Sequence, residues 1–196
     1  MSVLSRLGVP VFSAGGQPDI DIGRYVLAVG AMAQNAGQFS LEQIKGWPQS
    51  RIDARLTSVS GWSVRAVWEG ILWRDFINIS NPDPGARFAA FVSLGGGYDT
   101  TISLSDLDHG RVLLCHSVDG EPLEIEYGGP LRMIVPHLYG YKSAKWLGRI
   151  DFGTGMKGGY WEDRGYSRDG IIEPGVTLDM NTGQRRPIQG GEVVDF

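Results

Sequence analysis

The chain has 196 residues, of which 42% are hydrophobic and 20% are charged, a composition typical of a soluble globular protein. Its 18 basic and 22 acidic side chains give a formal charge of −4, which argues against bulk electrostatic attraction to nucleic acid. A single cysteine, Cys115, excludes an internal disulfide, and no apolar run is long enough to predict a membrane span. The N-terminus has no signal-peptide core, so we expect a cytoplasmic protein, or a periplasmic one if a leader has been removed.

The first 80 residues predict short strands and short helices. Residues 25–30 (YVLAVG) are rich in branched and aromatic side chains and predict a strand. Ser40 and Gln43 have the spacing of a capping box, which predicts a short helix after Ser40. Residues 51–62 (RIDARLTSVSGW) alternate between apolar and polar side chains and predict a strand. Residues 68–79 (WEGILWRDFINI) carry apolar side chains near helical spacing and predict a helix.

The rest of the chain predicts mainly strands, over 87–94, 98–104, 112–118, 131–136 and 144–152. Between them we expect one helical turn capped by Ser105 or Asp106, and a tight hairpin at Asp119-Gly120. From Gly153 onward, glycine, proline and charged residues predict a segment that wraps over the surface, apart from the aromatic YWEDRGY. We therefore expect one α+β domain over 1–196, with an N-terminal arm (1–20) and a wrapping C-terminal segment (153–196).

A cluster of basic residues lies in the segment that ends near residue 150. Arg132, Lys142, Lys145 and Arg149 fall close together in an acidic chain, and Ser143 stands between the two lysines. Ammonium groups, a hydroxyl and backbone amides on one loop suit a phosphate. Short basic loops are also common as solvated turns, so the spacing alone leaves both interpretations open.

The stretch LTSVSGWS (56–63) raises a second question, because Ser58 stands four residues before Trp62. A nucleophilic serine would need a histidine base, and none of the three histidines has a recognisable partner spacing. The sequence also lacks the G-x-S-x-G pattern of hydrolases and the ligand spacing of a zinc site. From these residues alone Ser58 is a polar residue of a half-buried strand, and Cys115 is a buried structural thiol.

Three segments together resemble the sulfite oxidase-like molybdopterin-binding family. They are SVSGWSVRAVWEGILWRDF, DGEPLEIEYGGPLRMIVPHLYGYKSAKWLGRIDF and GYWEDRGY, and the second is the most specific. The resemblance implies a sulfite oxidase-type fold of strand-rich mixed sheets with a few short helices. It also implies an oxidoreductase-like protein with molybdopterin, or the molybdenum cofactor, as its ligand and a redox protein as a possible partner. We expect no haem, because nothing in the chain resembles the haem domain of larger members.

The resemblance also assigns roles to single residues. In the family pattern C-V-x-G-W-S a cysteine thiolate binds molybdenum, and Ser58 stands at that position here. The cofactor-binding positions implied, in chain order, are Ser93, Tyr127 (where asparagine or histidine is usual), Arg132, Lys142, Ser143, Ala144 and Lys145. The arginine- and tyrosine-bearing sulfite pocket of true sulfite oxidases is not recognisable. The phosphate end of the cofactor site thus matches the family, whereas the metal end departs from it.

The serine decides which function is expected. A hydroxyl is a harder and far less acidic donor than a thiol, although a high-valent metal can stabilise an alkoxide. Three functions stay open: a pterin-binding protein with an atypical or lost molybdenum site, an oxygen-atom-transfer enzyme with serine or solvent as ligand, and a non-catalytic relic that acts through a protein partner. Replacement of an original cysteine by serine would give the same sequence. Substrate, electron partner and oligomeric state do not follow from the sequence.

Overall fold

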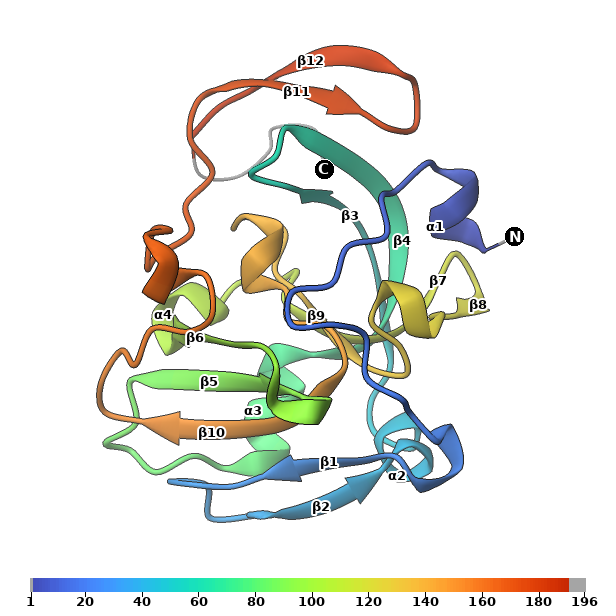
Figure 1. Ribbon diagram of the computed structural model, residues 1–196. Coiled ribbons are helices and arrows are strands. Elements are labelled where there is room, and N and C mark those ends of the chain that lie inside the picture. Colours follow the sequence, from blue (N-terminus) through green and yellow to red (C-terminus); the bar gives the residue numbers. More distant parts are fainter. Residues whose placement is uncertain (1, 191–196) are drawn as a thin grey trace.

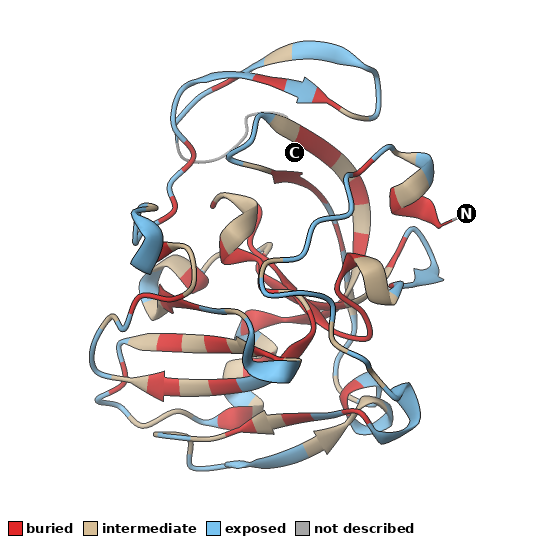
Figure 2. Ribbon diagram, in the orientation of Figure 1, coloured by how far each residue is buried: buried red, intermediate tan, exposed pale blue. Residues whose placement is uncertain are grey.

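The computed structural model describes residues 2–190, which form two mixed β-sheets joined by short helices (Figure 1). The first sheet has five strands in the order β2 (Gly37–Ser40), β1 (Val26–Val29), β10 (Leu147–Gly153), β5 (Phe88–Ser93) and β6 (Asp99–Ser103). Strand β1 runs parallel to β10, and the other pairs are antiparallel. Burial alternates along β5, so that one face of this sheet is turned to the core (Figure 2).

The second, seven-stranded sheet is organised around the long strand β4 (Trp62–Leu72). Antiparallel to β4 lie β3 (Ser50–Thr57) and β7 (Leu113–Val118), and parallel to it lies β11 (Gly175–Asp179). The remaining strands are β12 (Gln184–Ile188), β8 (Glu121–Pro122) and β9 (Arg132–Ile134). Because β9 is followed by the loop that leads into β10, residues 132–147 connect the second sheet to the first.

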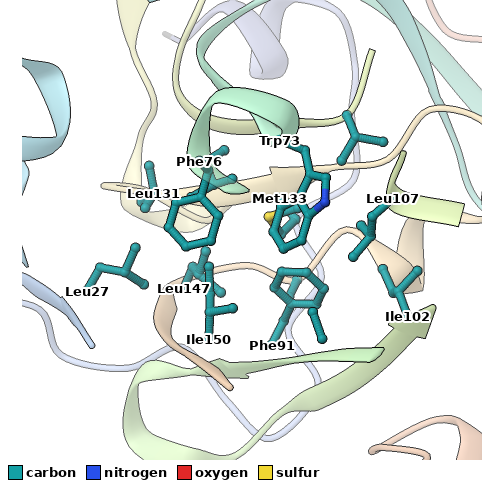
Figure 3. Close-up of a cluster of buried hydrophobic side chains, with 14 of the residues drawn as sticks. Leu27, Trp73, Phe76, Phe91, Ile102, Leu107, Leu131, Met133, Leu147 and Ile150 are labelled. Carbon is teal, nitrogen blue, oxygen red and sulfur yellow. The ribbon is translucent and has the colours of Figure 1, made fainter. Parts of the chain in front are cut away.

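The helices are short. They are α1 (Val3–Arg6), α2 (Leu41–Lys45), α3 (Trp73–Ser80) and α4 (Leu104–Leu107), with single 3-10 turns η1 (Ile22–Arg24), η2 (Leu94–Gly96), η3 (Ile125–Tyr127), η4 (Gly140–Lys142) and η5 (Glu162–Arg164). Trp73 and Phe76 of α3 point into a core shared by both sheets, where the Trp73 ring lies 5.6 Å from that of Phe91 (Figure 3). A second core packs α1 against β3 and β4. Among residues 2–190, no helix is long and apolar enough to cross a bilayer.

The expected α+β fold is confirmed, as is the capping box, in which Ser40 and Gln43 exchange hydrogen bonds of 3.2 and 2.8 Å. The predicted helix over 68–79 is wrong in its first half. Residues 68–72 belong to β4, and the helix starts only at Trp73. A Cβ at Gly70 would lie 1.9 Å from the Leu114 carbonyl oxygen, so the neighbouring strand packs directly on this glycine. Pairing with β3 and β7 thus overrides the apparent helical spacing.

Other boundaries also differ from the prediction. The predicted strand over 51–62 ends at Thr57, and a turn at 58–61 leads into β4. The cap of α4 is Ser103, whose hydroxyl accepts from the amide of Asp106, and not Ser105 or Asp106. The tail after Gly153 contains the β11–β12 hairpin, which extends the second sheet instead of only wrapping over it (Figure 1). The signal missed there is the alternation in GVTLD (175–179), whose burial follows period two at its end.

Candidate cofactor-binding site

A cavity of about 450 Å³ lies where several segments distant in sequence meet. Its walls come from the N-terminal arm, the β3–β4 turn, the ends of β5 and β9, the loop over 140–146, and the aromatic segment after Gly159. The volume is in the range of small-molecule and cofactor sites. Among the described residues that line it, two are basic, Arg132 and Lys145, and none is acidic. The cavity therefore favours an anionic ligand.

Arg132 is fixed inside the protein at one side of this cavity. Only 4% of its surface is exposed, and its guanidinium donates to the carbonyl oxygens of Tyr127 (2.7 Å), Ser143 (3.2 Å) and Met133 (3.3 Å). Burial lowers the pKa of Arg132 to about 10, which leaves the group charged at neutral pH. Three of its five N–H groups are engaged, so the side chain keeps donors for a ligand.

Lys145 is the second cation of the cavity. Its Nζ atom donates to the carbonyl oxygens of Phe12 (2.8 Å) and Glu126 (3.0 Å) and lies 5.1 Å from the centre of the Trp146 ring. Burial, together with the charge of Arg132, lowers the pKa of Lys145 to about 7. Since no carboxylate lines the cavity within residues 2–190, the charges of Arg132 and Lys145 are not neutralised there, and a phosphate dianion would offset both charges.

Three further predicted residues line the same cavity. The Ser93 hydroxyl donates to the carbonyl oxygen of Lys145 (2.6 Å), and the Ser143 hydroxyl accepts from the amide of Val135 (2.9 Å). Tyr127 lines the cavity as well, and its hydroxyl donates to the carbonyl oxygen of Val9 (3.2 Å). The two serines therefore hold the backbone of the 143–145 segment in place, and the Lys145 side chain extends from a fixed main chain.

Ser58 lies in the turn between β3 and β4 and also lines the cavity. Its hydroxyl is 2.8 Å from that of Ser60 and accepts from the amide of Ser60 (3.2 Å). The turn is closed by hydrogen bonds from the Ser58 amide to Trp62 and from the Gly61 amide to Ser58. This corner of the cavity offers hydroxyl oxygens and no thiol.

An aromatic wall that the sequence did not reveal completes the cavity. Trp161 stacks on Tyr166 at 4.8 Å, and Tyr166 meets Tyr141 edge to face at 5.3 Å. Tyr98 also lines this region, and its hydroxyl donates to the carbonyl oxygen of Tyr141. The sequence signal was the aromatic segment YWEDRGY, but nothing local indicates which of its rings turn inward.

The structure does not bring every predicted residue to the cavity. Lys142 is fully buried, its Nζ atom lies 2.5 Å from a carboxylate oxygen of Glu162, and it also donates to the carbonyl oxygen of Thr101. It is therefore absent from the cavity lining, because the η4 turn directs it inward to a structural ion pair. Ala144 is 1% exposed and packs in the core, and Arg149 lies on the surface beside Asp151.

Cys115 does not supply a thiol to this cavity. It is fully buried in β7, its sulfur donates to the carbonyl oxygen of Ser117, and burial raises its pKa to about 12. Among residues 2–190 no cluster of three or more histidine, cysteine, aspartate or glutamate side chains could hold a metal ion. The cavity thus fits the anionic part of a pterin cofactor, while its own donors for a metal are hydroxyl oxygens.

Residues 14–161 match the family model described as the oxidoreductase molybdopterin binding domain, which spans most of the cavity-forming segments. The chain therefore belongs to this family, as the motifs predicted. It is 32% identical over 163 residues to the uncharacterized oxidoreductase YuiH of Bacillus subtilis, covering 82% of each chain.

Two other comparisons extend this result. The chain is 28% identical over 199 residues to sulfite oxidase of Arabidopsis thaliana, covering 83% of this chain and 50% of the relative. It is 28% identical over 154 residues to the protein-methionine-sulfoxide reductase catalytic subunit MsrP of Xanthomonas axonopodis pv. citri, covering 71% and 48%. The chain thus spans about half the length of these two relatives.

The crystal structure of the sulfane dehydrogenase SoxCD from Paracoccus pantotrophus has a similar fold. The TM-score is 0.68 at 15% identity, over 90% of this chain and 47% of that one. At this identity the likeness concerns the fold alone. It agrees with the sulfite oxidase-type architecture expected from the motifs.

Proposed function

We propose that this chain binds a molybdopterin cofactor in the cavity, with the phosphate held between Arg132 and Lys145 and the opposite end directed to Ser58. The observation that carries the proposal is the convergence of both cations, Ser93, Ser143 and Ser58 on one cavity that has no acidic side chain among its described lining residues. A dianionic phosphate would accept hydrogen bonds from the donors that Arg132 and Lys145 still have available.

The cofactor, when bound, would supply the oxygen-atom-transfer chemistry of a molybdenum oxidoreductase. Arg132 would hold its phosphate from a buried and fixed position, because three backbone carbonyls orient the guanidinium. The Trp161–Tyr166 wall would restrict solvent at the mouth of the cavity. Ser58 would present a hydroxyl oxygen where the family pattern has a thiolate.

We infer that serine in place of cysteine at position 58 weakens the retention of molybdenum and leaves pterin binding intact. A thiolate suits molybdenum better than a neutral hydroxyl does, and Ser58 lies on a different segment from the phosphate-binding loop. The binding role is therefore separable from catalysis. An active enzyme with serine or solvent as ligand is the second candidate, and membership of an oxidoreductase family favours it.

The test compares wild type with Ser58→Cys, both produced in cells with full cofactor synthesis. Pterin content, molybdenum content and turnover of sulfite and of methionine sulfoxide would be measured on both proteins. We expect equal pterin in both, and more molybdenum in the cysteine variant. Stoichiometric molybdenum with turnover in the wild type would favour the serine- or solvent-ligated enzyme, and absence of pterin from both would leave a relic that acts through a partner.

A further inference from the structure

The N-terminal arm crosses the molecule between α1 and β1 and supplies one wall of the cavity (Figure 1). Phe12, Ser13 and Ala14 line the cavity, although Phe12 itself is 61% exposed. On one side the arm is anchored by α1 and Val9 in the second core, and on the other it continues into η1 and β1. Its middle part thus bridges two well-packed regions while lying on the surface (Figure 2).

Few hydrogen bonds fix the middle part of the arm to the rest of the protein. Within the described residues, no backbone–backbone hydrogen bond joins residues 10–20 to any other part of the chain. The hydrogen bond that reaches it comes from Lys145 to the Phe12 carbonyl oxygen, at 2.8 Å. The Phe12 ring also lies over Trp161, with 6.2 Å between ring centres and 28° between the planes. A segment with so few buried contacts opens at low free-energy cost compared with the sheets around it.

We propose that residues 10–16 form a strap over the cavity, which opens to admit the anionic ligand and is latched shut by Lys145 once that ligand is bound. The proposal rests on the proposed function for the identity of the ligand, and on the Lys145–Phe12 and Phe12–Trp161 contacts for the latch.

Ligand binding and closure of the strap are coupled because both depend on the ammonium group of Lys145. Lys145 lines the same cavity as Arg132 and donates to two carbonyl oxygens, which leaves one N–H for a ligand. An anion between the two cations stabilises the charged form of Lys145. A charged donor holds the Phe12 carbonyl more strongly than a neutral one. Ligand and strap are therefore bound by the same group without competing for the same hydrogen.

The strap can be followed with a fluorophore on its exposed face. Val11 is 55% exposed, so Val11→Cys would accept a bimane label, whereas the native Cys115 is fully buried. The indole of Trp161 would quench bimane when the strap is closed, and Trp161→Phe shows how much of the signal depends on that ring. The measurement needs no pterin, so it gives an answer even if the proposed cofactor is wrong.

In the labelled protein, Lys145→Met should raise the open population about ten-fold, the loss of one charge-assisted hydrogen bond. Lys157→Met is the matched control, because Lys157 is exposed and is not among the described residues that line the cavity, and it should change nothing. Sodium sulfate should increase quenching in the parent protein and in the control, relative to sodium chloride at equal ionic strength, but not in Lys145→Met.

Two results would overturn the strap. Equal quenching in Lys145→Met and its parent would show that Lys145 does not hold the arm. Sulfate-induced loss of quenching would show that anion and arm compete for Lys145 instead of sharing it. Tyr127→Phe, which removes the hydroxyl that donates to the Val9 carbonyl oxygen and leaves Lys145 unchanged, separates a local effect of the latch from a general loosening of the arm.

Discussion

At one side of the cavity Arg132 and Ser143 are 4% and 2% exposed and are hydrogen-bonded to the backbone, whereas Ser58 lies on a turn whose next residue, Val59, is 47% exposed. The anion-binding side is built into the connection between the two sheets, so it cannot change without cost to the fold. The Ser58 turn is held by its own local hydrogen bonds. The Arg132 side of the cavity and the Ser58 turn are therefore under different physical constraints.

This difference implies that residue 58 can be substituted at little cost to the fold, whereas Arg132 cannot. A residue on a partly exposed turn that contacts only its neighbours contributes little to stability. A buried arginine that satisfies three carbonyl oxygens is part of the fold itself. Each of the following predictions tests one side of this comparison.

Substitution of Arg132 should have the largest effect on the free energy of unfolding. Arg132→Met would leave three carbonyl oxygens without their donor and should lower the free energy of unfolding by about 3–5 kcal/mol. Urea denaturation with and without sulfate measures this change. Arg149→Met, which removes an exposed arginine of β10, serves as the control and should cost less than about 1 kcal/mol. Equal losses in the two variants would mean that the anion-binding side is not part of the fold.

Lys145 should affect the ligand more than the fold. Lys145→Ala should weaken phosphate or pterin binding by about 1.5–3 kcal/mol, the contribution of a charge-assisted hydrogen bond. Isothermal calorimetry with inorganic pyrophosphate would measure the affinity, with Lys157→Ala as the control for one lost positive charge. An unchanged affinity in Lys145→Ala would reject its role at the phosphate.

The pKa of Lys145 sets the pH dependence of this binding. The folded-state pKa of about 7 lies below the usual lysine value, so the ammonium form prevails below pH 7 and is lost above it. Anion affinity should therefore be highest below pH 7 and fall by up to about ten-fold per pH unit above it. Sulfate is the suitable probe because it does not titrate in this range, and Lys145→Met should remove the pH-dependent part. A flat profile in the wild type would contradict the position of this pKa.

The sequence predicted much of this arrangement, for reasons that can be traced to particular residues. Alternating strands and the ordered motif around Arg132, Ser143 and Lys145 identified both the fold class and the residues that line the cavity. The fate of Lys142 could not be predicted, because its partner Glu162 lies 20 residues further along the chain and no local pattern joins them. The Trp161 and Phe12 contributions were missed for the same reason, since a contact between rings 149 positions apart in the sequence leaves no periodic signal.

Of the substitutions considered, Ser58→Ala should change the free energy of unfolding least. A small change would distinguish the Ser58 turn clearly from the Arg132 side of the cavity. Ser58→Ala removes a hydroxyl whose hydrogen bonds reach only Ser60, two residues away. The free energy of unfolding should change by less than about 0.5 kcal/mol, as at other partly exposed turn positions. Pyrophosphate affinity should stay at the wild-type value, because Arg132 and Lys145 are untouched. Thermal and urea unfolding, with calorimetry on the same samples, would test both expectations.

Ser143→Ala is the informative contrast, because it also removes a serine hydroxyl from the cavity. It leaves the buried amide of Val135 without its acceptor and should lower the free energy of unfolding by about 1–3 kcal/mol. If Ser58→Ala proved as costly as Ser143→Ala, the Ser58 turn would contribute as much to the stability of the fold as the Arg132 side of the cavity. The proposed separation of metal retention from pterin binding would then lose its structural basis.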